Sequence, residues 1–360
     1  MILQARWDRC LYQRGPDVHQ FIAEYLSETN RRLLLIAGAG FDPRSGLLCQ
    51  RLANHTSRMH GFFIREERPV TSPELQQRAS QNIGMLQTAC PTHQIVGIQI
   101  FAIDGAVIGG REIAKALGAL ALPDYSDVIV DISSLSKGIS FPIIRYLLDR
   151  IVVSHPSLNI HLFVTEHAET DGRIVEVASD RPDLIAGFSG DWGVESRKEA
   201  ATLWLPQLIK QQHRILDMIY KFVDPDDTCP ILPFPSQNPR LPDELLEEYR
   251  AELQSTWEVE PRDLVYAHER NPMDLYRTIL RLDDTRQRVF NEVGGSQIVL
   301  SPLGSKVLAI GALLAALDRN FPVAYVEAID YKVDPGILDG TIAPSGELVH
   351  IWLAGKLYET

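Results

Sequence analysis

One stretch of the chain occurs twice, and this repeat limits the possible folds more than any other feature of the sequence. Residues 129–150 have the pattern of a buried strand, a Ser-rich turn and an apolar helix, and residues 298–319 align with them without a gap. Seven of the 22 aligned positions are identical, among them Ser136-Lys137, which aligns with Ser305-Lys306. A strand–turn–helix element that returns in the second half of the chain predicts two similar units fused in tandem.

The composition is that of a globular protein, and it argues against several classes of partner. Of the 360 residues, 45% are hydrophobic and 23% are charged, and a chain of this length usually forms two domains. The net charge of −12 argues against polymeric nucleic acid as a partner, because neutralising phosphates requires a basic face. No apolar run reaches the ~20 residues of a membrane span, and the N-terminus lacks a signal-peptide pattern. We therefore expect a cytoplasmic protein with no membrane partner.

The cysteines and the known catalytic motifs give little direct indication of chemistry. Four cysteines lie far apart in the sequence, which predicts a reducing compartment, no disulfide framework and no metal site. The sequence contains no Walker loop and no Gly-x-Ser-x-Gly nucleophile turn. Catalytic residues therefore stay unknown at this level. The four cysteines are Cys10, Cys49, Cys90 and Cys229.

Apolar runs of strand length alternate with helical patterns along the chain, which is typical of parallel sheets covered by helices. The sequence predicts an α/β protein of two tandem Rossmann-like units, with mostly parallel sheets and helices on both faces. We place the first unit at residues 1–180 and the second at 200–360, with a connector at 181–199. A short C-terminal β-hairpin is expected over residues 341–356, with Gly346 in its turn.

A glycine-containing turn follows the first buried strand, and it is a candidate ligand-binding turn. Gly38 and Gly40 allow a ligand to approach the backbone. Asp42 is a good N-cap and Pro43 a good first helical residue, which predicts that a helix begins there. Arg44 has the charge to bind a phosphate or a carboxylate. The alternative is that Arg44 pairs with a structural acid.

Both Ser-Lys turns are candidate anion sites. Backbone N–H groups at the start of a helix lack partners, and the helix dipole adds positive potential. Two such turns that face each other across a pseudo-twofold axis would bind one shared ligand. The alternative is that Ser and Pro only cap the helices and that both lysines lie in solvent. The candidates are Asp131, Ser133 and Lys137 in the first turn, and Ser301, Gly304, Ser305 and Lys306 in the second.

Two further polar groups end predicted strands, where open α/β sheets bind ligands. The first follows the strand at 264–267, and the alternative there is a helix start with Asn271 near the cap. The second is Glu166-His167, which could do acid–base chemistry, although a solvated strand end is the commoner case. The first group, our second-rank site, consists of His268, Glu269, Arg270 and Asn271.

The first Ser-Lys turn resembles a known ligand motif. Residues 131–137 fit the pattern Asp/Asn-x-Ser/Thr-x-x-x-Lys/Arg after a central strand. This resembles CARF domains, the Rossmann-like sensors of cyclic oligonucleotides in prokaryotic antiviral systems, and SAVED domains resemble two such units in one chain. The resemblance implies that Asp131, Ser133 and Lys137 line a nucleotide pocket, with the turn at 38–44 as its other wall. The second turn would be a degenerate copy, because Leu300 stands where the acid is expected.

The glycine turn also resembles the first motif of S-adenosylmethionine-dependent methyltransferases. In that family an acidic residue ends the second strand, and Glu66 or Glu67 has the matching position after an apolar run. This resemblance implies S-adenosylmethionine as the cofactor and methyl transfer as the reaction.

Three functions are therefore open. The first is a nucleotide-sensing or accessory subunit of a bacterial defence system, which binds a small anionic nucleotide such as a cyclic oligonucleotide and regulates a protein partner. The second is a methyltransferase-like enzyme. The third is a non-catalytic structural subunit whose apolar helices serve assembly, and a homo-oligomer is the commonest kind of assembly.

Overall fold

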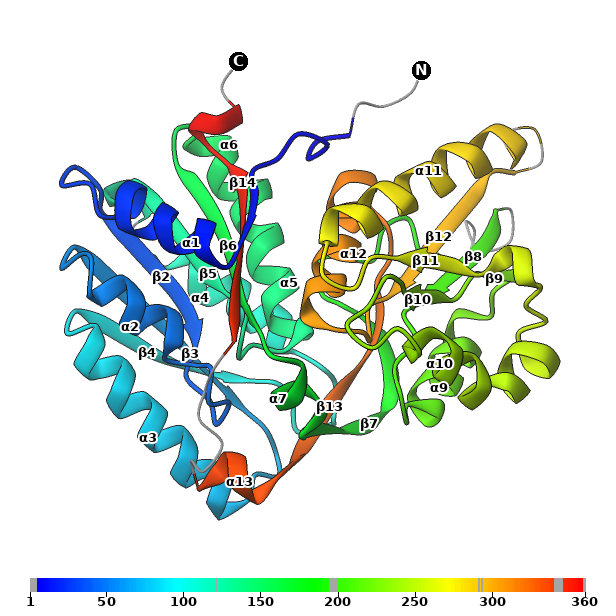
Figure 1. The fold of residues 1–360 in the computed structure, drawn as a ribbon, viewed down its shortest axis with the longest axis horizontal. Coiled ribbons are helices and arrows are strands. Elements are labelled where there is room, and N and C mark those ends of the chain that lie inside the picture. Colours follow the sequence, from blue (N-terminus) through cyan, green and yellow to red (C-terminus); the bar gives the residue numbers. More distant parts are fainter. Residues whose placement is uncertain are drawn as a thin grey trace. The chain divides into compact units, whose positions relative to one another are not determined.

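The computed structural model describes residues 5–120, 122–193, 200–290, 292, 294–339 and 346–358. The structure is of the α/β class and divides into two compact units, whose elements are labelled in Figure 1. Unit 1 consists of Met1–Arg9 and Ala178–Glu327, and unit 2 consists of Cys10–Val177 and Ala328–Thr360.

Unit 2 is built on a seven-stranded sheet. Its strands are β1 (Tyr12–Arg14), β2 (Leu33–Gly38), β3 (Met59–Glu67), β4 (His93–Gln99), β5 (Asp127–Asp131), β6 (Asn159–Glu166) and β14 (Glu347–Ala354). They lie in the order β1-β14-β6-β5-β2-β3-β4, in which the last five strands are parallel and β1 and β14 are antiparallel to their neighbours. The chain order reverses between β2 and β5, and such a switch point is where Rossmann-like sheets bind ligands.

Helices cover both faces of this sheet (Figure 1). Leu33, Leu35 and Ala37 of β2 alternate along the strand and pack on one face with Leu48 and Leu52 of the following helix. The helices of unit 2 are α1 (Pro16–Phe21), α2 (Leu47–Ala53), α3 (Pro73–Ala89), α4 (Gly109–Gly118), α5 (Lys137–Tyr146), α6 (Val152–Ser154), α7 (Ala168–Gly172) and α13 (Pro335–Leu338), with π or 3₁₀ turns at η1 (Ile22–Leu26), η2 (Leu122–Asp124), η3 (Leu147–Ile151) and η6 (Lys356–Tyr358). On the opposite face α4 packs against α5.

Unit 1 has a smaller parallel sheet of the same kind. Its strands are β8 (Ala201–Pro206), β9 (Asp227–Thr228), β10 (Ile231–Pro233), β11 (Val265–Ala267) and β12 (Ser296–Ser301). β12, β8 and β9 form one parallel ladder and β10 and β11 form another. A parallel bridge between Gln207 and Ile231 joins the two ladders. Its helices are α9 (His213–Val223), α10 (Leu241–Glu248), η4 (Glu252–Thr256), η5 (Pro261–Asp263), α11 (Pro272–Phe290) and α12 (Lys306–Arg319).

Two strands contain the points at which the chain passes from one unit to the other. These strands, β7 (Ile174–Leu184) and β13 (Ala324–Val333), pair with each other. The segment that leads into β13 also joins the sheet of unit 1, through a parallel bridge between Leu300 of β12 and Val323.

The two units repeat one strand order, as the sequence repeat predicts. In unit 2 the order is β6-β5-β2-β3-β4, and in unit 1 the matching positions are held by Val323, β12, β8, β9 with β10, and β11. The aligned helices also agree, because α5 begins at Lys137 and α12 begins at Lys306. The predicted fold of Rossmann-like α/β units with mostly parallel sheets is therefore confirmed.

The division of the chain differs from the expected ranges 1–180 and 200–360 at both chain ends. The C-terminal strand β14 is part of unit 2, because it forms a ladder with β6. The first residues are part of unit 1, where the buried Trp7 donates its backbone N–H to the hydroxyl of Tyr276 (3.1 Å). Pairing between segments far apart in the sequence decides both placements, and a linear reading of the chain does not contain that information.

The described residues do not form the predicted C-terminal hairpin. Residues 341–345 lie outside the described residues, and β14 pairs with β6 and β1 rather than with a strand next to it in the chain. The backbone N–H and C=O groups of this apolar strand form their hydrogen bonds within the large sheet. Within the predicted connector, Phe188 is buried and its carbonyl accepts a hydrogen bond from Val323 N (3.0 Å), so this stretch packs in unit 1.

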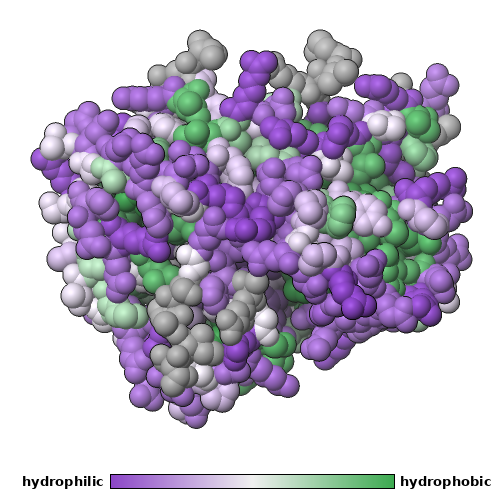
Figure 2. Space-filling model, viewed as in Figure 1, coloured by the Kyte–Doolittle hydropathy of each residue, from purple (hydrophilic) through white to green (hydrophobic). Residues whose placement is uncertain are grey.

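No described helix is both long and apolar enough to cross a membrane. The face in Figure 2 is mostly hydrophilic, and apolar side chains gather in patches between the hydrophilic ones. The four cysteines, all within the described residues, form no disulfide. Burial raises the pKa of the Cys49 thiol to about 12.

Candidate functional site

The structure brings the glycine turn and the first Ser-Lys turn together at the switch point of unit 2. Gly38 ends β2, and its carbonyl accepts a hydrogen bond from the hydroxyl of Ser134 (3.3 Å). A Cβ atom at Gly38 would lie 2.5 Å from that hydroxyl, so only glycine permits this approach. By contrast, a Cβ atom at Gly40 would have no neighbour within 4 Å. The seven candidate residues of unit 2 therefore belong to two adjoining turns.

Asp131 and Ser133 form hydrogen bonds that link the end of β5 to β6. Asp131 Oδ1 accepts hydrogen bonds from the backbone N–H of Ser133 (3.0 Å) and from its hydroxyl. The Ser133 hydroxyl oxygen in turn accepts from Thr165 N of β6 (2.7 Å). Both side chains are buried, so their polar atoms serve the sheet. The implied role of Asp131 and Ser133 in lining a nucleotide pocket stays a prediction.

A carboxylate of the chain itself lies at the start of α5. Glu66 Oε1 accepts a hydrogen bond from the backbone N–H of Ser136 (2.7 Å), the residue before Lys137. Glu66 comes from the end of β3, and β2 lies between β3 and β5, so the carboxylate reaches across the end of β2. Its second oxygen accepts from Arg68 Nη2 (2.6 Å). This N–H group therefore holds an anion, as helix starts favour.

The Ser136 side chain takes no part in that contact. Ser136 occupies the N-cap position of α5, yet its side chain makes no capping hydrogen bond. Its Oγ is buried, and among the described residues it has no hydrogen-bond partner. A buried hydroxyl without a hydrogen-bond partner is uncommon in proteins.

The glycine turn is held by an ion-pair cluster. Arg44 is buried, and its guanidinium contacts Asp42 (2.7 Å) and Asp171 (2.7 Å). Burial lowers the pKa of Arg44, but the two carboxylates more than reverse this, so the pKa lies above its ordinary value. Asn82 donates to the carbonyls of Gly40 (2.8 Å) and Asp42 (2.9 Å). The structure thus shows the alternative, in which Arg44 pairs with structural acids.

The expected helix start at Asp42 is wrong. The carboxylate of Asp42 accepts from the backbone and side chain of Arg44, and α2 begins at Leu47 after a turn. Since the side chain of Asp42 is committed to Arg44, it does not cap a helix. Local capping preference was outweighed by the buried arginine two residues later.

The matching turn of unit 1 has uncharged side-chain acceptors. Ser305 caps α12, because its Oγ accepts a hydrogen bond from Leu308 N (3.2 Å). The backbone N–H of Gly304 donates to Gln207 Oε1 (3.2 Å), and Gln207 is buried. The hydroxyl of Ser301 accepts from Trp204 Nε1 (2.9 Å). The side-chain acceptors at this turn are thus a carboxamide and a serine hydroxyl, whereas the turn of unit 2 has a carboxylate on Ser136 N.

Lys137 and Lys306 lie in different units, each at the first residue of its helix and each partly exposed. The expectation that the two lysines share one ligand stays a prediction.

The second-rank cluster forms the start of a helix. Asn271 Oδ1 accepts a hydrogen bond from Met273 N (3.1 Å), directly before α11. His268 Nδ1 accepts from the backbone N–H of Arg270 (3.1 Å), and Glu269 accepts from the backbone N–H of Gln237 (2.7 Å). The geometry matches the alternative stated above, in which Asn271 lies near the cap.

Glu166 and His167 are also engaged within unit 2. Glu166 pairs with Arg14 of β1, which also contacts Glu347 of β14 (2.7 Å). His167 Nδ1 accepts from Thr170 N (3.1 Å) at the start of α7.

Sequence reasoning missed a buried polar chain that crosses unit 2. His161 Nε2 contacts Asp127 Oδ1 (3.1 Å), and His161 Nδ1 contacts His350 Nε2 (3.0 Å). Burial lowers the pKa of both histidines, that of His350 far below its ordinary value. Burial acts to raise the pKa of Asp127, but the hydrogen bond from His161 and the charge of Arg31 bring it below its ordinary value. The signal in the sequence was one histidine inside each of two apolar strands.

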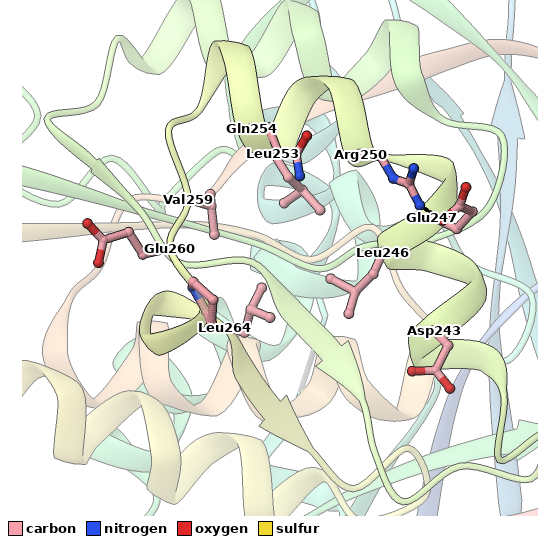
Figure 3. Close-up of a pocket in the computed structure, with 10 residues that line it drawn as sticks. Asp243, Leu246, Glu247, Arg250, Leu253, Gln254, Val259, Glu260 and Leu264 are labelled. Atoms are coloured by element: carbon pink, nitrogen blue, oxygen red, sulfur yellow. Dashed lines mark hydrogen bonds and ion pairs between the residues drawn. The ribbon is translucent and has the colours of Figure 1, made fainter.

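Unit 1 contains a pocket of about 330 Å³ beside α10 (Figure 3). Leu246, Leu253 and Leu264 lie along its apolar part. At its rim Glu247 pairs with Arg250. None of the residues named from the sequence lines this pocket. Among the described residues, no three His, Cys, Asp or Glu side chains gather as a metal ion would require.

Comparisons with known proteins give no family. No protein-family model matches the chain, and no curated protein matches it. Solved structures that overlap it include the cytoplasmic domain of a prokaryotic cation chloride cotransporter, at 12% identity, over 83% of this chain and 96% of that one, with a TM-score of 0.25. Another is the glycopeptide N-methyltransferase MtfA complexed with sinefungin, at 15% identity, over 49% of this chain and 63% of that one, with a TM-score of 0.21. At these scores neither overlap carries a functional argument.

Proposed function

We propose that the protein binds a small anionic ligand of nucleotide type at the switch-point site of unit 2, which consists of the glycine turn and the first Ser-Lys turn, and that it works as a sensor or accessory subunit rather than through chemistry of its own. The observation that carries this proposal is the Glu66 carboxylate on the backbone N–H of Ser136 (2.7 Å). An amide at the start of a ten-residue helix that already holds one anion suits a phosphate equally well.

In this proposal the Glu66 carboxylate occupies the anion position of the ligand while no ligand is bound. A phosphate group replaces the carboxylate on Ser136 N, and Lys137 adds its charge. The buried Ser136 hydroxyl supplies a further hydrogen bond. The open space above Gly40 admits the rest of the ligand.

Displacement of Glu66 would also transmit ligand binding to other parts of the chain. Arg68, which binds Glu66, contacts the carbonyl of Ala328 and the hydroxyl of Tyr331 (3.2 Å), both in β13. Since β13 is one of the strands in which the chain passes between the units, release of Glu66 changes the contacts of a segment shared by both. A ligand that favours the released state shifts the population toward it.

The resemblance to CARF and SAVED domains adds the finer part of the proposal. We assign a cyclic oligonucleotide as the ligand, a protein partner as the target of regulation, and bacterial defence as the setting.

The test is a calorimetric titration of the whole chain with cyclic di-, tri- and tetra-adenylate. The wild type is compared with Glu66→Gln, which keeps the side-chain shape and removes the competing charge, and with Lys137→Ala. The next residue gives the matched control, Glu67→Gln, because the Glu67 carboxylate contacts Arg65 and Gln99 rather than the turn at Ser136. We expect about tenfold tighter binding by Glu66→Gln. We expect about tenfold weaker binding by Lys137→Ala and no change in the control.

The same variants separate the alternative functions. A methyltransferase-like protein would use Glu66, the acid at the end of the second strand, to bind its cofactor, so Glu66→Gln would weaken binding of S-adenosylmethionine. A structural subunit is favoured by the internal hydrogen bonds of Asp131, Ser133 and Arg44. Absence of binding by both the wild type and Glu66→Gln, for all four ligands, would overturn the sensor proposal and leave the structural one.

A further inference from the structure

Unit 2 contains a pocket of about 260 Å³. Its residues precede β2 and β5, lie at the start of β6 or follow β14, which runs antiparallel to β6, so they gather where the parallel strands begin. Glu66 and the two switch-point turns lie where the same strands end. The pocket is lined by Asn30, Arg31, Tyr125, Ser126, His155 and Lys356, among others.

Arg31 presents a donor that the chain does not satisfy. Its side chain is 9% exposed, with Nη1 on Asp127 Oδ2 (3.1 Å) and Nη2 on Glu28 Oε2 (2.9 Å). Its Nε is buried and has no hydrogen-bond partner among the described residues. A guanidinium Nε carries only a donor, so it requires an acceptor atom from outside. Leaving such a donor unpaired in the interior costs free energy.

His155 presents a second atom of this kind, from a different segment. Its Nδ1 is buried and likewise has no partner in the described part of the chain. His155 lines the same pocket, and with its proton on Nδ1 the ring has a donor to offer. Lys356, an exposed residue of η6, adds a positive charge from a third segment.

The negative groups near the pocket are already engaged. Asp127 lies behind Arg31 and accepts hydrogen bonds from Arg31, His161 and the hydroxyl of Ser126 (2.6 Å). Glu28 pairs with Arg31 from the side. Arg31, His155 and Lys356 thus line one pocket, and the two nearby acids already contact Arg31.

We propose that this pocket binds the phosphate group of a small molecule, with Arg31 Nε, His155 Nδ1 and Lys356 as its donors. A phosphate has only acceptor oxygens when ionised, and it suits donors that converge from several directions. The pocket is larger than one phosphate ion, so the source is either free phosphate or the phosphate group of a nucleoside monophosphate.

The test is isothermal titration of the full chain with inorganic phosphate and, separately, with adenosine 5′-monophosphate. The variants are His155→Leu and Lys356→Ala. Their matched controls are His55→Leu and Lys332→Ala, two exposed residues of the same unit outside the pocket. Arg31 is left intact, because its contact with the buried Asp127 is part of the fold.

We expect saturable binding of at least one probe by the wild type, about tenfold weaker binding by each pocket variant, and affinities within about twofold of the wild type for both controls. A nucleotide that binds much more tightly than free phosphate identifies a phosphorylated molecule as the natural ligand. Equal affinities identify the free ion. Absence of binding by the wild type, or pocket variants that bind like their controls, would overturn the proposal.

Lys137→Ala distinguishes this pocket from the switch-point site. Because Lys137 lies where the parallel strands end and the pocket lies where they begin, this variant should keep its affinity for inorganic phosphate even where it loses the cyclic oligonucleotide. Loss of phosphate binding by Lys137→Ala would assign the phosphate to the switch-point site and overturn the proposal of a second site.

Discussion

The two Ser-Lys turns share a backbone and differ in what their amides hold. Ser136 has φ −68° and ψ 160°, Ser305 has φ −54° and ψ 155°, and each is followed by a helix that begins at the aligned lysine. In unit 2 the turn holds the carboxylate of Glu66, and in unit 1 it holds a serine cap and the carboxamide of Gln207. The repeat therefore sets the geometry of the turn. Residues elsewhere in each unit set its charge.

The largest effect is expected at the glycine turn of unit 2, beside the anion-holding amide. Arg44→Ala leaves Asp42 without its buried partner and should lower the free energy of unfolding by about 3–5 kcal/mol. Chemical denaturation, followed by two independent spectroscopic probes, measures this change in the free energy of unfolding. Arg65→Ala, which breaks an exposed pair with Glu67, should cost at most about 1 kcal/mol. Equal losses of unfolding free energy in the two variants would show that the ion pairs of Arg44 do not stabilise the glycine turn.

A fall in pH should destabilise unit 2 more than unit 1. The reason is that the buried histidines of the described chain, His161 and His350, both lie in unit 2. Both folded-state pKa values lie below the unfolded value near 6.5, so the unfolded chain binds more protons. Their contribution to stability is fully present above about pH 6.5. It is lost as the pH falls from there toward the folded-state values, by about 1.4 kcal/mol per pH unit for each histidine.

Hydrogen exchange between pH 7 and pH 5 tests this difference. Amides of β6 and β14 should lose protection as the pH falls, after correction for the intrinsic exchange rate, and amides of β8 and β12 should keep it. His350→Gln should reduce the pH dependence by one histidine's share, and the exposed His55→Gln should leave it unchanged. Equal losses of protection in both sheets would contradict the assignment.

Exchanging the carboxylate of unit 2 for a carboxamide, and the carboxamide of unit 1 for a carboxylate, should lower the stability of the protein in each case. Glu66→Gln replaces a charge-assisted hydrogen bond with a neutral one and should cost about 1–2 kcal/mol. Gln207→Glu should cost about 1–3 kcal/mol, because a buried carboxylate cannot donate to the carbonyl of Leu308 as the carboxamide does (3.3 Å). Thermal unfolding of both variants measures these losses. A more stable Gln207→Glu protein would show that the turn of unit 1 also accepts an anion.

The smallest effects concern the aligned serines. Ser305→Ala removes a capping hydrogen bond and should cost about 1 kcal/mol. Ser136→Ala removes a hydroxyl that has no partner among the described residues, so it should cost nothing measurable or stabilise slightly. A cost for Ser136→Ala equal to that for Ser305→Ala would mean that both serines cap their helices in solution.

The sequence was sufficient to predict the fold class, but not the charge at the switch-point site. Apolar periodicity and the repeat predicted the parallel sheets and a helix after each Ser-Lys turn, because local patterns determine these features. The resemblance to methyltransferases pointed to Glu66 or Glu67 as an acid at a strand end, but the contact of Glu66 with Ser136 spans 70 residues. Likewise β14 joins β6 from the far end of the chain. Contacts of this range depend on tertiary packing, which a single sequence does not display.

The most direct test of the central claim follows the backbone amide of Ser136 by nuclear magnetic resonance. Titration of the ¹⁵N-labelled protein with cyclic tetra-adenylate should shift the Ser136 signal saturably, and Glu66→Gln should saturate at a lower ligand concentration. A Ser136 signal that does not move in either protein, while other amides do, would place the ligand elsewhere and contradict the account.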